Sequence, residues 1–269
     1  MTAIRTATLR DLEAVLDWAA AEGWNPGLDD AAAFHAADPG GFLVAEDGTG
    51  LTGAISVVRH GPSMAFLGLF IVRPDRRGTG IGRALWDRGI ALAGDRTVGL
   101  DGVAAQEANY ARSGFVRTGA SIRFEGRIAP EPAEARPAGP HDLPRLAVMD
   151  RAATGYDRAA FLTAWTAPSD ARLTLIARDG FATVRRCRTG CKIGPVVAPN
   201  ADAGLALCRA AAAAMPAKTH IVDAAPGSAF GATLAAAGLT ETFRTARMYR
   251  GPAPSGDGTQ QAIATMELG

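Results

Sequence analysis

The stretch AFLGLFIVRPDRRGTGIGRALWDRGIAL, residues 65–92, decides the fold class of this chain. Its apolar first part, residues 65–72, predicts a buried strand that ends before Pro74. Glycines at a helix start leave backbone N–H groups open to an anion, and the helix dipole favours negative charge there. The stretch therefore predicts a strand, a turn and a pyrophosphate cradle. The expected cradle residues are Arg77, Gly78, Thr79, Gly80, Ile81, Gly82 and Arg83.

Two other interpretations compete with this one. Asp101 lies 21 residues after Gly80, about where a dinucleotide-binding domain places its ribose-binding acid. However, Arg83 stands where the third glycine of that fingerprint belongs, and residues 73–77 separate the strand from the glycines. An ordinary helix start with incidental glycines is the remaining alternative, because a lone glycine motif is weakly diagnostic.

The string Arg77-x-x-Gly80-x-Gly82 after a strand resembles the acyl-CoA pyrophosphate loop of the GNAT superfamily of N-acetyltransferases. The segment Tyr110-Ala-Arg-Ser-Gly-Phe115 is similar to the one that closes the CoA site in that superfamily. Strand-like residues 4–7, followed by a helix from Thr8, match its first strand and helix. The resemblance covers residues 1–127. It implies an α/β fold with a mixed sheet, and acetyl-CoA as cosubstrate.

Residues 128–140, IAPEPAEARPAGP, contain four prolines and predict a linker between a catalytic domain, residues 1–127, and a second domain, residues 141–269. The second part repeats the first faintly, since Asp101 corresponds to Asp223 and Arg123 to Arg247. We therefore expect tandem GNAT-like folds, with an unrelated α/β domain as the alternative. No arginine–glycine series follows Pro199, so the second copy is expected to lack the CoA loop. Residues 251–258 are expected to be flexible, and residues 261–268 to form a closing strand.

Composition narrows the function classes. With 48% hydrophobic and 20% charged residues the chain is typical of a globular protein, and its net charge of +1 gives no reason to expect nucleic acid or an anionic membrane as partner. No apolar run approaches the roughly 20 residues of a membrane helix, so we expect a cytoplasmic protein. The three cysteines indicate reduced thiols, and no residue pattern predicts a metal site.

The resemblance implies acetyl transfer from acetyl-CoA to a primary amine, with Tyr110 as general acid for the departing thiolate. It also places the backbone of Phe70, Ile71 and Val72 beside the thioester, where the pantetheine arm adds like an extra strand. Gly68 is expected to mark a bulge in that strand. A tyrosine that merely packs against Phe115 is the alternative for Tyr110.

The general base is not marked by any motif. Many superfamily members carry a glutamate on the fourth strand, yet residues 65–72 contain no acid. Glu22, after the first helix, and Asp101, at the end of the fifth strand, are the candidates for binding or deprotonating the substrate ammonium. The alternatives are an exposed carboxylate for Glu22 and a helix cap for Asp101. Trp24 and Asn25 are expected to wall the acceptor pocket.

The sequence is most consistent with an enzyme that acetylates a small amine-bearing metabolite. A homodimer is compatible with the sequence, and no feature of the sequence requires it. A non-catalytic acyl-CoA-binding sensor is the rival, favoured by the missing strand glutamate and opposed by Tyr110 and the intact loop. Modification of an aminoglycoside would call for a more acidic pocket. In the second part, Lys192 and Arg247 are candidates for facing a cleft between the domains.

Overall fold

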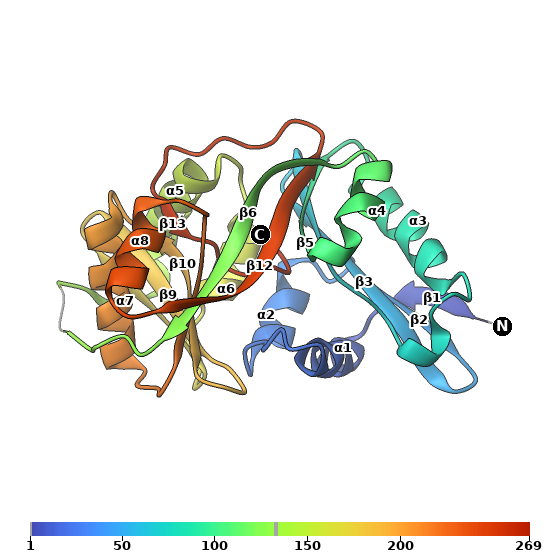
Figure 1. Ribbon diagram of the computed structural model, residues 1–269, viewed down its shortest axis with the longest axis horizontal. Helices are drawn as coiled ribbons and strands as arrows, with labels where there is room; N and C mark the ends of the chain where they lie inside the picture. The colour runs from blue at the N-terminus through green and yellow to red at the C-terminus, as the bar shows by residue number, and fades with distance from the viewer. Residues whose placement is uncertain (1, 132–133) are drawn as a thin grey trace.

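A mixed sheet of 13 strands runs through both halves of the chain in a computed structural model that describes residues 2–131 and 134–269. Its strand order is β1-β2-β3-β4-β5-β12-β6-β11-β13-β10-β9-β8-β7. Helices cover both faces, and the two halves lie side by side along the sheet (Figure 1). The mixed α/β fold predicted from the sequence is confirmed.

The two halves repeat the same order of elements. The first half consists of β1 (Ala3–Thr6), α1 (Leu9–Ala21), α2 (Asp30–Ala37), β2 (Phe42–Asp47), β3 (Gly50–His60), β4 (Met64–Val72), α3 (Ile81–Ala93), β5 (Thr97–Gly102), α4 (Glu107–Arg112) and β6 (Val116–Gly126). The second half consists of β7 (Arg136–Pro137), α5 (Leu143–Thr154), α6 (Ala159–Thr166), β8 (Arg172–Ala177), β9 (Gly180–Arg186), β10 (Cys191–Val197), α7 (Ala201–Ala214), β11 (His220–Ala224), α8 (Ala229–Ala236) and β12 (Thr240–Arg250), followed by β13 (Gln260–Ala262). The predicted internal repeat is therefore present in the fold.

The last strand of each half pairs with the other half. β12 is antiparallel to β5, with Arg247 opposite Asp101, while β6 is antiparallel to β11, with Arg123 opposite Asp223. β6 and β12 also pair with each other and run together through the middle of the molecule (Figure 1). Each half therefore has its sheet completed by a strand from the other, and backbone hydrogen bonds along these strands join the halves.

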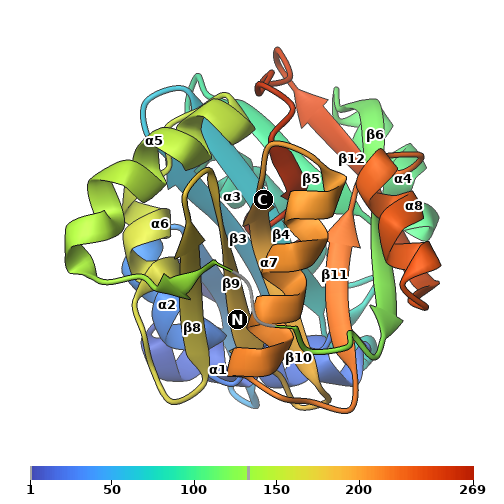
Figure 2. The ribbon, with the colours of Figure 1, turned by 90° about the vertical axis from the view of Figure 1, so that its left-hand side faces the viewer.

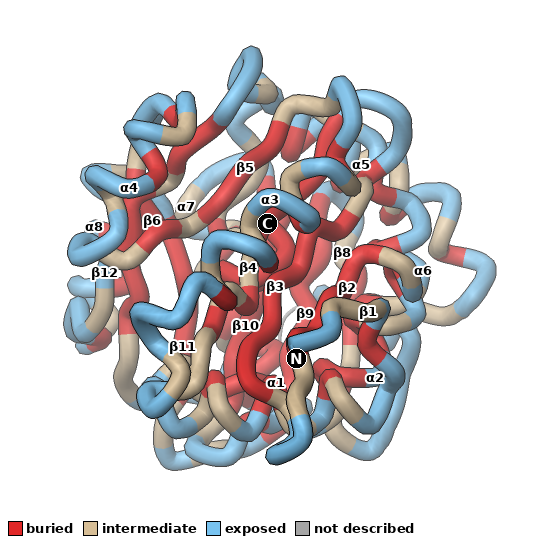
Figure 3. The backbone as a smooth tube through the Cα atoms, turned by 90° about the vertical axis from the view of Figure 1, so that its right-hand side faces the viewer, coloured by how far each residue is buried: buried red, intermediate tan, exposed pale blue. Residues whose placement is uncertain are grey.

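Apolar clusters on the two faces of the sheet explain how the helices are held. On one face, Leu85 of α3 and Tyr110 of α4 pack with Val98 and Leu100 of β5. On the other face, α1 and α2 meet α6 of the second half, where the rings of Phe34 and Trp165 stack at 5.9 Å. α7 and α8 cover the second half in the way α3 and α4 cover the first (Figure 2). Figure 3 shows the buried strands inside and the exposed surface on the outer helices and loops.

Three expectations, about the linker and about the C-terminal residues, need correction. Residues 132 and 133 of the predicted linker lie outside the described residues, but Arg136–Pro137 pair with β8 and Ile128 is 1% exposed, so parts of 128–140 are packed. The predicted closing strand is wrong in extent, because β13 ends at Ala262 and the following residues turn into the core. Residues 251–258, expected to be flexible, approach α5, where the Asp257 N–H donates to the Ala152 carbonyl at 2.9 Å.

Among residues 2–131 and 134–269, no helix combines the length and the hydropathy that crossing a bilayer requires. Cys187, Cys191 and Cys208 are free and buried.

Candidate active site

The parallel strands β4 and β5 separate at the point where the site opens. Their pairing ends at Leu67 opposite Leu100, and beyond it Phe70–Val72 pair only with β3 among the described strands. The register of β4 on β3 shifts just after Gly68, and Leu69 has a φ of +44°. This geometry confirms a bulge beside Gly68 and leaves the far edge of β4 free to accept an added strand.

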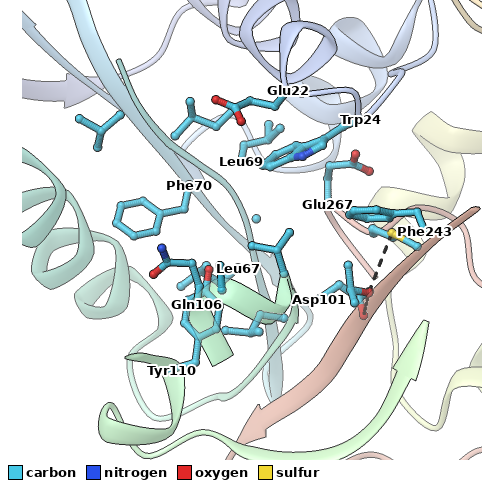
Figure 4. A pocket seen from close by; sticks show the side chains of 18 of the residues that line it. Glu22, Trp24, Leu67, Leu69, Phe70, Asp101, Gln106, Tyr110, Phe243 and Glu267 are labelled. Carbon is cyan, nitrogen blue, oxygen red and sulfur yellow. Dashed lines mark hydrogen bonds between the residues drawn. The ribbon is translucent and has the colours of Figure 1, made fainter. Parts of the chain in front are cut away.

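A cavity of about 470 Å³ occupies this opening (Figure 4). Both halves of the chain supply its walls. The first half contributes Glu22, Trp24, Leu67, Gly68, Leu69, Phe70, Ile71, Val72, Arg77, Leu100, Asp101, Val103, Ala105, Gln106, Tyr110 and Arg123. The second half contributes Phe243, Thr245, Met266 and Glu267. The volume suits a small ligand rather than a polymer.

The glycine-rich loop presents an open helix start beside the cavity. Gly78 and Gly80 have φ values of +77° and +89°, and a Cβ on either would meet nothing within 4 Å. Gly80 is the N-cap of α3, and no side chain caps the helix there. The first backbone N–H groups of α3 are therefore available to an anion, as expected for a pyrophosphate cradle.

The arginines of the loop form ion pairs. Arg77 lines the cavity and donates to the Glu22 carboxylate at 3.0 Å and to the Val72 carbonyl at 3.1 Å. Arg83 has 80% of its side chain exposed and pairs with Asp87 one turn further along α3. A phosphate arriving at the helix start would have to compete with these exposed pairs, which are individually weak.

Tyr110 extends from α4 into the cavity wall. Its ring stacks on Trp86 at 5.7 Å, and Gly102 leaves room for it, since a Cβ there would lie 2.6 Å from the ring. Burial raises the pKa of the Tyr110 hydroxyl to about 12. The phenol therefore stays protonated at neutral pH and is fit to donate a proton.

The two acids expected as base candidates are both engaged. The Asp101 side chain has no exposed surface, and its oxygens accept hydrogen bonds from Arg247, Ser121 and Thr245. Glu22 is at the rim, 44% exposed, with Arg77 on its Oε1. The alternative for Asp101, a helix cap, is wrong, because its hydrogen-bond partners lie on β6 and β12. The same saturated contacts argue against proton transfer to Asp101.

Trp24 lines the cavity as expected, whereas Asn25 is not among the lining residues. Asn25 has a φ of +52°, donates to the Thr189 carbonyl at 2.8 Å and accepts from the Thr189 N–H at 3.2 Å. Its side chain is therefore used to join the two halves. The Trp24 carbonyl accepts from the buried Lys192 ammonium at 2.9 Å, so Lys192 does face the junction of the halves.

Four cavity residues of the second half were not predicted from the sequence. Phe243 and Thr245 belong to β12, and Met266 and Glu267 belong to the segment after β13. No local motif marks these residues. The repeat that relates Arg123 to Arg247 was the available signal, because each arginine binds the aspartate of the other half.

The corresponding opening of the second half is filled by the chain itself. β10 and β11 pair in parallel over Cys191–Ile193, and β13 then lies between them, with Ala262 opposite both Val196 and Ala224. The start of α7 is capped by the Asn200 side chain, which accepts from the Ala203 N–H at 2.9 Å. In the second half, β13 therefore fills the gap between the parallel strands, and the Asn200 side chain caps the helix. The equivalent strand gap and helix start of the first half are open.

Comparison with known proteins agrees with this geometry. A sequence model of the acetyltransferase (GNAT) family matches residues 9–118, and one of the acetyltransferase (GNAT) domain matches residues 146–262. The holothin acyltransferase of Pseudoalteromonas sp. (strain SANK 73390) is 31% identical over 276 residues, which cover 98% of this chain and 94% of that protein.

Solved structures show the same fold. A provisionally assigned acetyltransferase from Pyrococcus horikoshii superposes with a TM-score of 0.84 at 20% identity, covering 100% of this chain and 96% of that one. A tandem GNAT protein from the clavulanic acid biosynthesis pathway gives a TM-score of 0.63 at 18% identity, covering 94% and 99%. The dinucleotide-binding alternative is excluded. The chain therefore belongs to the GNAT family of acyltransferases and carries two GNAT domains in tandem.

Proposed function

We propose that the protein transfers an acetyl group from acetyl-CoA to a primary amine of a small metabolite, with Tyr110 as general acid. One observation carries this proposal. The free edge of β4 and Tyr110 line a single cavity together with Arg77, which begins the loop leading to the uncapped start of α3. A thioester cofactor needs these three features together, for its pantetheine arm, its pyrophosphate and its leaving sulfur.

In this proposal the pantetheine arm adds along Phe70–Val72 and the pyrophosphate occupies the loop from Arg77 to Arg83. Backbone N–H groups of the β4 edge stabilise the oxyanion of the tetrahedral intermediate. Tyr110 gives its proton to the CoA thiolate when the carbon–sulfur bond breaks. Tyr110 is protonated at neutral pH, because burial holds its pKa at about 12, and is therefore in the form that can donate a proton.

The acidic residues on the acceptor side of the cavity support the proposal that the acceptor is an amine. Three carboxylates, those of Glu22, Asp101 and Glu267, line it, and acids attract an ammonium group. We assign Glu22 to the rim, where it holds Arg77, and Asp101 to holding Arg247. Because β12 and residues 263–269 wall this side, we propose a small acceptor and a site complete within one chain. Holothin, after which the relative is named, belongs among the acceptors to be tested.

A sensor that binds acyl-CoA without turnover is the second candidate, favoured by the arginine pairs that engage Glu22 and Asp101. Calorimetric titration of acetyl-CoA, followed by release of CoA thiol with a panel of amines, separates the two. We expect a dissociation constant of about 1 μM to 1 mM, weakened at least tenfold in an Arg77→Ala, Arg83→Ala double variant, and turnover with at least one amine. Binding without turnover on the whole panel would favour the sensor, and no binding would contradict both.

A further inference from the structure

Residues 260–269 run from the filled opening of the second half into the cavity of the first. β13 lies between β10 and β11, and the Ile263 N–H then donates to the Asp223 carbonyl at 3.0 Å. Ala264 and Leu268 are buried against the first half, and the Leu268 carbonyl lies 2.8 Å from His60 Nε2. The segment is therefore anchored at both ends, with Met266 and Glu267 in the cavity wall between the anchors.

Glu267 is fixed against the point where β4 leaves β5. A Cβ built on Gly68 would lie 2.1 Å from the Glu267 carbonyl oxygen, so the two backbones touch at a position that only glycine allows. Gly68 directly follows Leu67, the last β4 residue paired with β5. In Figure 4 Glu267 lies beside Trp24 and Phe243, on the other side of the cavity from Tyr110.

The carboxylate of Glu267 differs from the other two acids of the cavity. Glu22 is bound by Arg77 and Asp101 by Arg247. Glu267 is 6% exposed, its Oε2 accepts from the Thr265 hydroxyl, and no lysine or arginine of the described residues lies within 4.0 Å of it. Of the cavity acids in the described chain, it is thus the one whose oxygens are free of an arginine.

Buried cations surround Glu267 without pairing directly with it. The pKa of Arg123 lies above its ordinary value, since the charges of Asp223 and then of Glu267 outweigh the effect of burial. The pKa of Lys192 is lowered by burial and by Arg123, against the opposing charge of Glu267. Arg185 is a further buried cation that Glu267 influences. The Glu267 carboxylate thus lies within electrostatic range of three buried cations without forming an ion pair with any of them.

We infer that Glu267 is the proton acceptor for the amine, an inference that rests on the proposed function. The substrate ammonium first gives one proton to Glu267. Its nitrogen then forms a bond to the thioester carbon, and collapse of the tetrahedral intermediate breaks the carbon–sulfur bond. The sulfur takes the Tyr110 proton, the remaining excess proton on nitrogen restores Tyr110 through solvent, and Glu267 releases its proton to solvent. One ammonium and one thioester thus give one amide, one thiol and one proton.

The acid that the fourth strand lacks is accordingly supplied by a segment of the second half. The filled opening between β10 and β11 gives this segment a fixed starting point. A domain without its own CoA loop thereby retains a part in the chemistry.

The test is Glu267→Gln, which keeps the size of the side chain and an oxygen for the Thr265 hydroxyl. Initial rates are measured with acetyl-CoA and the fastest acceptor from a panel of holothin, benzylamine, histamine and spermidine. Loss of a general base lowers the rate about 10²- to 10⁴-fold. We expect kcat to fall at least 100-fold, with the dissociation constant for acetyl-CoA unchanged. Glu241→Gln, an exposed acid paired with Arg244, is the matched control and should stay within twofold of wild type.

The pH profile distinguishes proton transfer from a structural role. In Glu267→Gln the remaining kcat should rise about tenfold per pH unit up to the pKa of the amine and then level off, because only amine that is already neutral can attack. Glu267→Asp should recover part of the rate. A variant within twofold of wild type, or one that raises only the KM for the amine, would overturn the inference while leaving the proposed function intact. No turnover by the wild-type protein on the panel would contradict the proposed function, and with it the inference.

Discussion

Arg247 of β12 donates two hydrogen bonds to the Asp101 carboxylate of β5, from Nε at 3.0 Å and from Nη2 at 2.5 Å. Arg123 of β6 holds Asp223 of β11 in the same bidentate way, at 2.9 and 3.0 Å. The two pairs occupy equivalent places in the two halves, and each joins the halves through an exchanged strand. Asp101 of one pair and Arg123 of the other line the cavity.

Asp101→Asn should therefore destabilise the whole protein. Removing one partner of a buried ion pair leaves an uncompensated charge, here that of Arg247, and typically costs about 3–5 kcal/mol. We expect a loss of that size in the free energy of unfolding, measured by urea denaturation. Glu241→Gln, at the exposed pair with Arg244, should cost at most about 1 kcal/mol. Equal effects of the two variants would argue against the buried pair.

Tyr110→Phe should reduce turnover without reducing cofactor binding. The phenylalanine ring keeps the stacking on Trp86, so only the proton donor is removed. We expect kcat to fall about 10²- to 10³-fold, with the dissociation constant for CoA within twofold of wild type. Steady-state kinetics and calorimetry check the two quantities. An unchanged kcat would remove the general-acid role.

Gly68→Ala should displace the segment that carries Glu267. The added methyl group would meet the Glu267 carbonyl oxygen at 2.1 Å, and neither backbone can rotate away as a side chain would. We expect a lower melting temperature and a kcat at least tenfold lower. Gly119→Ala is the control, since a Cβ there meets nothing within 4 Å. Similar behaviour of both variants would mean that the contact between residues 68 and 267 is unimportant.

We expect the buried His60 to lower the free energy of unfolding in acid. Burial lowers the pKa of His60 to about 4, and its ring lies against Tyr156 and Phe161. The unfolded chain takes up a proton near pH 6.5, whereas the folded chain does so only near pH 4. Stability is therefore complete above pH 6.5 and is lost as the pH falls through this window, by up to about 3 kcal/mol.

The measurement is urea denaturation at pH 7.5 and pH 5 for wild type and His60→Gln. Glutamine does not titrate and can still donate to the Leu268 carbonyl. The share of the pH effect that belongs to His60 should disappear in the variant. An identical pH dependence in both proteins would contradict the assignment.

The parts of the site that the sequence predicted are encoded locally. The β4 strand, the glycine loop and Tyr110 with Gly114 and Phe115 are contiguous motifs, in which the residues that act together are neighbours in the chain. Their secondary structure follows from short-range rules, such as the Thr8–Asp11 capping box that begins α1. For these elements a pattern of a few residues is sufficient to predict the structure.

The other features of the fold and of the site depend on contacts between segments that are distant in the sequence. The exchange of β6 and β12, the Asp101–Arg247 pair and the contact of Glu267 with Gly68 each join residues more than 90 positions apart. Backbone pairing across such distances leaves no periodic trace in either segment. The prediction that Asn25 lines the acceptor pocket was wrong for the same reason, since its partner Thr189 belongs to the other half.

We propose that the first half alone holds the acyl-CoA, while the second half completes the acceptor side. Calorimetric titration of acetyl-CoA into wild type, Gly80→Asp and Asn200→Asp tests it most directly. Gly80→Asp places a carboxylate at the uncapped start of α3, whereas Asn200→Asp exchanges one good helix cap for another at α7. We expect one acetyl-CoA site per chain in wild type and in Asn200→Asp, and loss of that site in Gly80→Asp. Two sites per chain, or binding by Gly80→Asp as tight as that of wild type, would contradict it.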